Sequence, residues 1–263
     1  MNMHQTKDNI KLKIHKNFIN IIFNRPHKKN ALNSDMIHEI QEALNNFKDN
    51  KQIKVIVFSS DCNIFCAGAD LQSLHNIKDF SYEENLEDST MLMNLFKTML
   101  TYPKLIISKV EGAAIAGGCG ITTASDIVFS TDEGKFGYPE VKIGFIPALV
   151  SAFLTKKINE QFARELLLTG KLIDAKRAFE IGMINFLCKK TTINNHVDSF
   201  IKNHIRTTSY NSIYETKKML YKWLNIDEKL NIAAEFNAKN RQSEDFKKGI
   251  SSFLDKHKID WSK

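Results

Sequence analysis

Cysteine is scarce in this sequence, which has only Cys62, Cys66, Cys119 and Cys188 in 263 residues. Four cysteines in a chain of this length do not make a disulfide framework. Cys62 and Cys66 lie four positions apart, but neither a second close pair nor a histidine at ligand spacing accompanies them, which argues against a zinc site. We therefore expect reduced thiols and no bound metal, with Cys66 and Cys119 acting as small residues inside glycine-rich motifs.

The sequence also has no long apolar run, no tract rich in proline, glycine or serine, and no internal repeat. Its longest uncharged stretches, such as residues 112–125, are shorter than the roughly 18–20 residues that a membrane span requires. Residues 1–8 lack the apolar core of a signal peptide. These absences predict a cytoplasmic protein without a membrane partner and without a free linker between folded parts.

The charge is unbalanced towards lysine and arginine, with a formal net charge of +7. A basic surface attracts polyanions, including nucleic acids and phosphorylated cofactors. However, the lysines are scattered, mostly as pairs, and no basic run carries interleaved aromatic residues. This pattern argues against a nucleic-acid module and leaves solubility or a phosphorylated small molecule as reasons for the charge.

Strand and helix signals alternate over the first 145 residues. Asn33 can cap a helix over 34–48 with apolar residues on one face, and Pro103 ends a second helix over 91–100. Strands are expected in two parts of 10–23 and at 55–58, 105–110 and 127–130. The acidic, polar segment 77–89 is expected to be mobile surface. The alternation predicts an α/β layered core with crossover helices.

Helical signals dominate the remainder of the chain. Gly170 ends a helix over 160–169. Further expected elements are helices at 148–155 and 175–181, a strand at 184–188, and helices at 197–205, 212–224, 227–236 and 246–254. We therefore expect a core over 1–195 that carries the site, followed by a helical region over 196–263 whose apolar faces suit oligomerisation.

The strongest chemical signal lies between Glu111 and Pro147. Gly117, Gly118 and Gly120 follow an apolar strand-like run and open a helix. Such a turn aims free backbone N–H groups and the positive end of the helix dipole at one point. That arrangement suits an anion, or an oxygen that becomes negative during a reaction. The alternative is that the glycine turn serves packing alone.

Glu140 follows Pro139 in an apolar context. A carboxylate held in such surroundings can have a raised pKa and can move protons near neutral pH. Together with a donor site, one such carboxylate indicates enolate chemistry. The alternative for Glu140 is a solvated loop residue, which is the usual role of a glutamate after proline.

Five segments resemble, in order and spacing, the signatures of the crotonase superfamily, the enoyl-CoA hydratase/isomerase group. They are Asn24-Arg25-Pro26 with Asn30-Ala31-Leu32, FCAGADL (65–71), AIAGGCG (114–120) with Ala124-Ser125-Asp126, FGYPEVKIGFIP (136–147) and Ser243-Glu244-Asp245-Phe246. The resemblance covers nearly the whole chain, and the ordered set is far more specific than any one segment. It implies an α/β fold, a crotonase-like spiral of βα (ββα) units with a C-terminal helical trimerisation region.

The same resemblance implies a coenzyme A thioester as substrate, no tightly bound cofactor, and assembly into a homotrimer or a hexamer that pairs two trimers. It assigns Glu140 as general base and acid, and the N–H groups of Ala69 and Gly117 as donors to the thioester oxygen. Residues implied in substrate or coenzyme A binding are Lys29, Ala31, Ala67, Ala69, Asp70, Leu71, Gly117, Gly118 and Phe246. Asp70 can also cap a short helix.

Gly120 departs from the family pattern, because two-glutamate hydratases carry a glutamate at this position. One remaining carboxylate favours Δ3-Δ2-enoyl-CoA isomerase chemistry, which lifts a proton and returns it. Family members that resemble methylglutaconyl-CoA hydratases also have glycine at the position of Gly120. A one-glutamate enoyl-CoA hydratase therefore stays the first hypothesis. Residues 148–151 replace the glycine-rich run of the family, which predicts a remodelled acyl pocket.

Two alternatives belong to other classes of protein. A basic RNA-binding protein on the same scaffold is supported by the net charge of +7. A non-catalytic trimer that acts as a scaffold is the other, and the intact Glu140 and glycine loops argue against it.

Overall fold

The computed structural model describes residues 3–262, and within them seven strands form the larger of two sheets. Their order is β1 (Met3–Thr6), β2 (Ile10–Ile14), β3 (Phe18–Phe23), β4 (Val55–Ser60), β6 (Leu105–Val110), β8 (Ile127–Thr131) and β11 (Phe186–Cys188). The first three strands pair antiparallel, and every pair from β3 to β11 is parallel. The apolar runs predicted all of these strands except β1.

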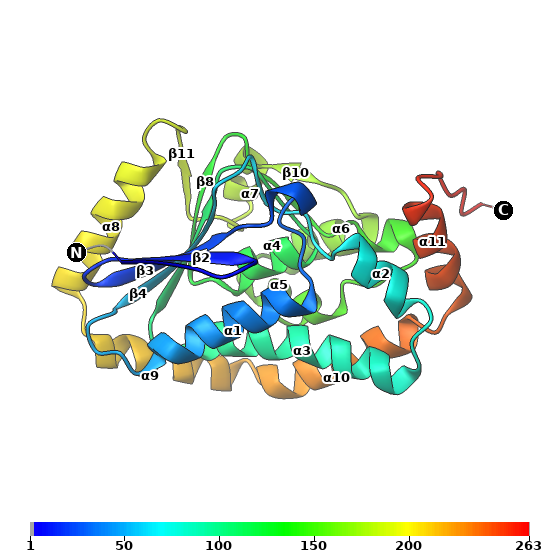
Figure 1. Cartoon of the computed structure of the whole chain (residues 1–263), viewed down its shortest axis with the longest axis horizontal. Coiled ribbons are helices and arrows are strands. Elements are labelled where there is room, and N and C mark those ends of the chain that lie inside the picture. The colour runs from blue at the N-terminus through cyan, green and yellow to red at the C-terminus, as the bar shows by residue number, and fades with distance from the viewer. Residues whose placement is uncertain (1–2, 263) are drawn as a thin grey trace.

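Helices cover both faces of this sheet, and the side chains of β4 show how. Val55 and Val57 pack in a cluster with α8 (Ile193–Thr207), whereas Ile56 and Phe58 belong to the main core with α1 (Ser34–Lys48) and α3 (Tyr82–Thr101). Successive side chains of a strand point to opposite faces, so an uninterrupted apolar run indicates a sheet buried on both sides. Figure 1 shows α8 and α1 on opposite sides of the strands.

A smaller sheet lies beside the first and contains, among the described residues, four short strands. Their order is β10 (Ile173–Asp174), β9 (Lys135–Gly137), β7 (Ala113–Ile115) and β5 (Ile64–Cys66). β5, β7 and β9 are parallel, and each directly follows a strand of the larger sheet. The chain therefore repeats a strand–strand–helix unit, which confirms the predicted α/β spiral.

The remaining helices are α2 (Leu71–Ile77), α4 (Gly117–Ala124), α5 (Ala148–Lys157), α6 (Glu160–Thr169), α7 (Ala175–Glu180), α9 (Tyr210–Trp223), α10 (Ile226–Asn240) and α11 (Glu244–Leu254), with 3-10 helices η1 (Pro26–Lys28) and η2 (Pro139–Ile143). No range was predicted for α2, α4 or the two 3-10 helices, and the others fall close to their predicted ranges. The Asn33 side chain accepts a hydrogen bond from the Met36 N–H at the start of α1, and Gly170 ends α6 in the left-handed conformation. Both caps are those that the sequence indicates.

The expectation of a mobile surface segment at 77–89 is wrong. α3 begins at Tyr82, and Ser81 and Glu84 form a reciprocal capping box at its start. Asn85 and Ser89, one turn apart, are fully buried on this helix. The Ser-x-x-Glu spacing is visible in the sequence and predicts a helix start, but two buried polar residues made the segment look like surface.

The C-terminal helices pack directly on the core. α10 lies against α3 and α5, and α11 lies against α2 and η2. Figure 1 shows α11 at the far end of the molecule from α8. The expected division after residue 195 falls inside α8, and it stays a prediction. Within residues 3–262, no helix combines the length and the apolar character needed to cross a membrane.

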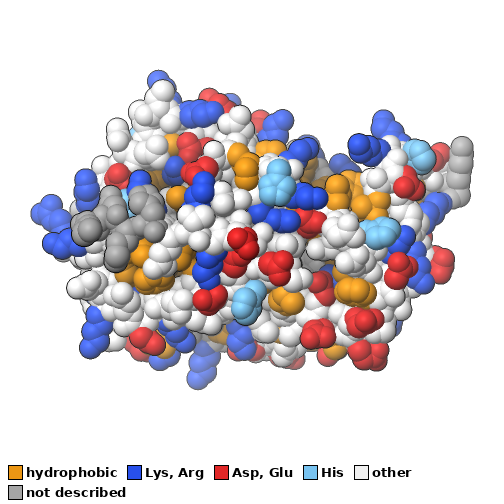
Figure 2. Space-filling view, in the orientation of Figure 1, with side chains coloured by type: hydrophobic (Ala, Val, Ile, Leu, Met, Phe, Trp, Pro, Cys, Tyr) orange, Lys and Arg blue, Asp and Glu red, His pale blue; other side chains and the backbone are white. Residues whose placement is uncertain are grey.

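The positive charge is dispersed over the surface. Figure 2 shows, on one face, lysine and arginine side chains interspersed with aspartate and glutamate side chains. Several pair at the surface, as Lys190 does with Glu133 at 2.9 Å. On the face shown, the charge therefore forms no continuous basic stripe of the kind that tracks a nucleic-acid backbone.

Candidate active site

Three neighbouring strand ends place the predicted chemical groups at one edge of the smaller sheet. β5 leads to Ala69, β7 leads to Gly117 and β9 leads to Glu140. These strands are parallel and β7 lies between the other two, so their carboxyl ends meet at the same edge. Such edges are where ligands bind in open α/β sheets.

Close backbone packing joins the two glycine-rich loops. A Cβ atom on Gly68 would lie 2.9 Å from the Cβ of Ala116, and one on Gly118 would lie 2.5 Å from the carbonyl oxygen of Cys66. Gly68 also has a φ of +94°, which other residues rarely adopt. The glycines therefore let the loop after β5 touch the loop after β7.

Ala69 and Gly117 each present a backbone N–H that no other described residue accepts. The Leu32 N–H donates to the Gly68 carbonyl (2.7 Å) and the Asp70 N–H donates to the Leu32 carbonyl (2.8 Å), which directs the intervening Ala69 N–H away from Leu32. Gly117 is the first residue of α4, where N–H groups have no intrahelical acceptor. Both residues line one cavity, so both donors are available to an oxygen inside it.

The direction of the Gly117 N–H depends on a strained neighbour. Ala116 has φ +51° and ψ −122°, a conformation that is costly for a residue with a side chain. Its N–H donates to the Gly137 carbonyl (2.9 Å), and its carbonyl accepts from the Gly120 N–H (2.8 Å). These two bonds hold the strained residue in place.

Glu140 lies on η2, which is fixed at both ends. The buried Tyr138 hydroxyl lies 2.6 Å from the Thr123 hydroxyl on α4. At the other end, the Gly144 N–H donates to the Glu140 carbonyl, and a Cβ on Gly144 would lie 2.2 Å from the Asp245 carbonyl oxygen of α11. The backbone of the candidate acid–base residue is therefore held between α4 and the C-terminal helix.

The Glu140 carboxyl group is almost completely shielded from solvent. The residue is 8% exposed, and its Oε2 has no hydrogen-bond partner among the described residues. Burial raises the pKa of this carboxyl from 4.5 to about 7 because it penalises the charged form, and a backbone hydrogen bond opposes the effect only in part. A group that titrates near neutral pH can both take and return a proton.

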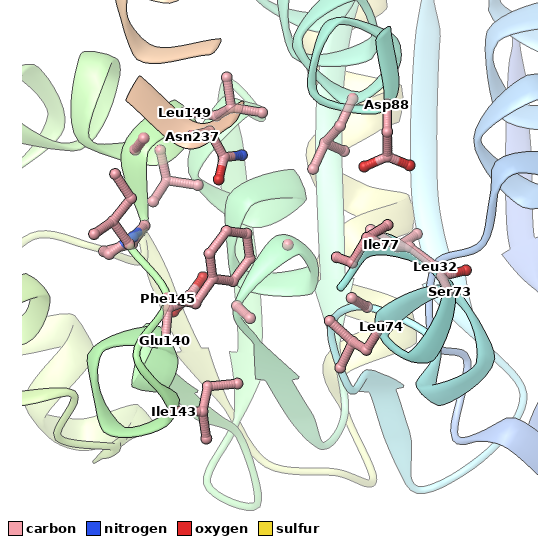
Figure 3. A pocket seen from close by; sticks show the side chains of 18 of the residues that line it. Leu32, Ser73, Leu74, Ile77, Asp88, Glu140, Ile143, Phe145, Leu149 and Asn237 are labelled. Carbon is pink, nitrogen blue, oxygen red and sulfur yellow. The ribbon is translucent and has the colours of Figure 1, made fainter. Parts of the chain in front are cut away.

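A cavity of about 490 Å³ connects these groups. Its volume lies within the range of roughly 300–1,000 Å³ that is usual for small-molecule sites. Figure 3 shows Glu140 and Ile143 on one side and Leu74 and Ile77 on the opposite side. The lining is mainly apolar and includes Leu92, Phe96, Ile115, Phe145, Ile146, Leu149 and Val150. This composition suits an apolar ligand group next to the two backbone N–H groups.

The other residues that the family resemblance implies in binding fall into two groups. Ala67 lines the cavity. Lys29 and Leu71 lie at the surface, with Leu71 54% exposed at the first turn of α2. Their contact with coenzyme A stays a prediction.

The second group lies behind the cavity wall. Arg25 joins two of its members, since its guanidinium donates to the Ala31 carbonyl and to the Asp70 carboxylate, the latter at 3.0 Å. Gly118 is buried inside α4, and Phe246 is buried with its ring edge against Phe145 at 5.3 Å between centroids. These four residues do not line the cavity, and their role in binding also stays a prediction.

Several polar residues of the cavity were not found by sequence reasoning, and three of them come from α3 and the end of α10. Asp88 of α3 and Asn237 and Arg241 around the end of α10 line the cavity. Figure 3 shows Asn237 beside Leu149 and Asp88 across the cavity from it. The spacing of four between Asn237 and Arg241 places them on one helix face. Nothing in the sequence indicates that this face meets α3, so no local signal could have identified the group.

Gly120, where two-glutamate hydratases carry a glutamate, is closely surrounded by apolar groups. A Cβ atom there would lie 2.6 Å from Phe96 Cζ and 2.9 Å from Val150 Cγ1. Phe96 is fully buried and its ring packs edge-on against Phe153 at 5.4 Å. The space in which a glutamate side chain would begin is therefore filled, and this side of the cavity is apolar.

The fold and the edge formed by β5, β7 and β9 define the class of protein. It is a spiral α/β protein in which two backbone N–H groups and one buried carboxyl group line the same cavity. The sequence matches the model of the enoyl-CoA hydratase/isomerase family over residues 13–263. The chain therefore belongs to that family, which confirms the resemblance to the crotonase superfamily.

Individual relatives match along most of the chain. A candidate enoyl-CoA hydratase of Thermus thermophilus is 32% identical over 93% of this chain and 98% of its own length. A crotonyl-CoA hydratase of Syntrophomonas wolfei is 27% identical over 97% of this chain and 98% of its own. The crystal structure of an enoyl-CoA hydratase/isomerase from Xanthobacter autotrophicus superposes with a TM-score of 0.86 at 25% identity, over 95% of this chain and 93% of that one.

Proposed function

We propose that this protein catalyses proton transfer on the acyl group of an acyl-CoA thioester, as a one-glutamate enoyl-CoA hydratase. One observation carries the proposal: the buried Glu140 carboxyl, whose Oε2 has no hydrogen-bond partner among residues 3–262, shares a cavity with Ala69 and Gly117, whose N–H groups donate to none of those residues. The N–H pair would hold the thioester oxygen as the enolate forms, when that oxygen becomes negative. The crotonyl-CoA hydratase among the relatives supports the hydration reaction.

In hydration, Glu140 acts first as a base. It takes a proton from water while the hydroxyl adds to the β-carbon, and the electrons of the double bond move to the thioester oxygen. The same carboxyl then returns a proton to the α-carbon as the enolate collapses. A carboxyl with a pKa of about 7 is suited to both steps, because neither protonation state dominates near neutral pH.

Isomerisation of a 3-enoyl-CoA to a 2-enoyl-CoA is the second candidate, and the surroundings of Gly120 favour it. With Phe96 and Val150 filling that space, the apolar wall offers no second carboxylate to hold a water molecule. Isomerisation needs only that Glu140 lifts a proton from the α-carbon and returns it to the γ-carbon. Both reactions use the same enolate and the same donors.

One pair of assays separates the two reactions. The protein is mixed with crotonyl-CoA, and loss of the conjugated thioester absorbance is followed; a 3-enoyl-CoA is then offered, and appearance of that absorbance is followed. Loss with crotonyl-CoA supports hydration, and appearance with the 3-enoyl ester alone supports isomerisation. Activity that survives Glu140→Gln would overturn the assignment of this residue.

The oligomeric part of the proposal concerns exposed apolar residues. Leu168, Trp223 and Phe236 are 66%, 70% and 62% exposed in the isolated chain. Large exposed apolar side chains often mark contacts between subunits. We propose a homotrimer or a dimer of trimers, and the measured mass in solution distinguishes these from a monomer.

A further inference from the structure

A buried ion pair lies next to the Ala69 donor, behind the cavity wall. The Arg25 guanidinium donates through Nη2 to Asp70 Oδ2 at 3.0 Å. Arg25 is 8% exposed and Asp70 is 3% exposed. The lost hydration of two buried charges offsets most of their attraction, so such pairs add little to stability. Stability alone therefore gives little reason to bury these two charges.

Both residues of the pair make further hydrogen bonds. Asp70 Oδ1 accepts from the Gln72 N–H at 2.8 Å and so caps α2, while its Oδ2 is bound by Arg25. Arg25 also donates through Nη1 to the Ala31 carbonyl, and its backbone N–H donates to Asn30 Oδ1 at 2.8 Å. Arg25 therefore connects Asp70 with the segment of chain that contains Ala31.

The two connected segments are the ones that direct the Ala69 N–H. Two backbone hydrogen bonds, of 2.7 and 2.8 Å, join Leu32 to the residues on either side of Ala69. Arg25 binds the neighbouring position in each segment, namely the carbonyl of Ala31 and the carboxylate of Asp70. Its planar guanidinium has two Nη atoms in a fixed geometry, so it sets the spacing of the two segments.

The loop that carries Ala69 consists of small residues. Ala67 and Gly68 precede it, and Gly68 has a φ of +94°. Glycine has more conformational freedom than any other residue, so a donor next to it depends on its surroundings for its direction. A displacement of about 1 Å in a positioned group can reduce a rate by about 100-fold. Support for this loop therefore has a direct effect on the reaction.

We propose that Arg25 is a positioning residue of the reaction, which keeps the Ala69 N–H directed at the thioester oxygen. It acts through Asp70 and the Ala31 carbonyl and touches no substrate itself. The inference rests on the proposed function, because that function places the thioester oxygen at this donor. The oxygen becomes more negative as the enolate forms, so a misplaced donor weakens binding of the transition state more than binding of the substrate.

Three variants remove the ion pair in different ways. Arg25→Lys keeps the positive charge, but its single nitrogen replaces the two Nη atoms that bind two acceptors. Asp70→Asn keeps the Oδ1 that caps α2 and removes the negative charge. The double variant Arg25→Met/Asp70→Asn leaves no unpaired buried charge, so it should fold even where a single variant does not.

Asp126→Asn is the matched control. Asp126 pairs with the buried Lys217 at 2.6 Å, and neither residue lines the cavity. This variant therefore also breaks a partly buried ion pair, but away from the Ala69 loop. Thermal unfolding of all variants checks that the fold is intact.

Kinetics with the enoyl-CoA that the wild-type protein converts give the first readout. In all three variants kcat should fall at least about tenfold while KM changes less than about threefold, because the lost interaction develops fully only in the transition state. The double variant should lose no more than the single variants, since each removes the same support. Asp126→Asn should keep the wild-type kcat.

The carbonyl stretch of a bound thioester gives a second readout that needs no turnover. Butyryl-CoA with ¹³C at the thioester carbonyl has no double bond to hydrate or move. Hydrogen bonds from two fixed donors weaken the C=O bond, so the infrared band of the wild-type complex should lie at lower frequency than that of the free ester. The shift should be smaller in the three variants and unchanged in Asp126→Asn.

Two outcomes would overturn the inference alone. If the folded variants match Asp126→Asn in kcat and in carbonyl frequency, Arg25 serves only the fold, and the proposed function stands. A rise of kcat in Asp70→Asn would show that the charge of Arg25 acts on the thioester oxygen directly and not through position. If butyryl-CoA does not bind to the wild-type protein, or binds without a shift of its band, the proposed function fails and this inference fails with it.

Discussion

The two ends of the cavity are built in different ways. At the end near Glu140, the donors are backbone N–H groups of Ala69 and Gly117, and close contacts that only glycine allows hold them together. At the other end, side chains of α3 and α10 supply the polar atoms, held by the Asp88–Arg241 ion pair. The first construction fixes a geometry through the backbone, whereas the second can change by substitution of single side chains.

The largest expected effect is the loss of kcat on substitution of Glu140. Glu140→Gln keeps the shape of the side chain but removes the proton carrier, so kcat should fall by roughly 1,000- to 10,000-fold. The rate is measured with whichever enoyl-CoA the wild-type protein converts. Glu83→Gln makes the same change at an exposed position of α3 and should leave kcat within about twofold. Equal losses in both variants would remove Glu140 from the mechanism.

Gly68→Ala tests whether backbone contact holds the donors. The added Cβ would lie 2.9 Å from that of Ala116, so the loop that carries Ala69 must move away from the loop that carries Gly117. Misplacement of one oxyanion donor should lower kcat by about 100- to 1,000-fold. Gly182→Ala is the control, because Gly182 also has positive φ (+78°) but no atom within 4 Å of the added Cβ. It should lose a little stability and no activity, and a similar kcat for the two variants would contradict the argument.

Asp88→Ala tests the other end through stability. It leaves the guanidinium of Arg241, whose side chain is 5% exposed, without its counter-charge, which should lower the free energy of unfolding by about 3 kcal/mol. Lys97 and Asp227 pair α3 with α10 in the same way, but both side chains are about half exposed. Asp227→Ala should therefore cost less than about 1 kcal/mol. Urea unfolding measures both, and equal costs would show that the burial of Arg241 has no special role.

The smallest expected effect is the pH dependence that Glu140 imposes on stability. Its pKa is raised in the folded protein from 4.5 to about 7, so the folded state binds more protons than the unfolded state between these values. Stability should fall as pH rises through this window and level off above it. Glu140→Gln removes the effect and should be more stable than wild type by about 2–3 kcal/mol at pH 8, with little difference at pH 4. An unfolding difference that does not vary with pH would show that Glu140 is not buried as described.

Much of the fold was predictable because it depends on local patterns. The helix over 34–48, its Asn33 cap and the Gly170 stop were all indicated by residues within a few positions of one another. The segment at 77–89 was misread because Asn85 and Ser89 are polar and yet buried. Their burial depends on packing against the C-terminal region, where Arg241 meets Asn85, about 150 residues later in the chain.

In the candidate site, too, some residues were predictable from the sequence and others were not. Gly117 and Glu140 were visible because a helix N-terminus and a carboxylate in an apolar segment have direct chemical meaning. The Asp88–Arg241 ion pair was not predictable, since the two residues are 153 positions apart in the sequence and meet only through the packing of α3 and α10. The filled space beside Gly120 was invisible for the same reason, because Phe96 and Val150 come from two other helices.

The sequence by itself determined most strands of the larger sheet, most helices, the glycine loops and the candidate acid–base residue, because each depends on dihedral preferences, apolar periodicity or the chemistry of one side chain. Only the tertiary structure decided that β5, β7 and β9 lie side by side, so that Ala69, Gly117 and Glu140 face one cavity. It also decided the pKa of Glu140 and the composition of the other end of the cavity, around Asp88. Both depend on which distant residues exclude water from a given atom, and no local pattern specifies that.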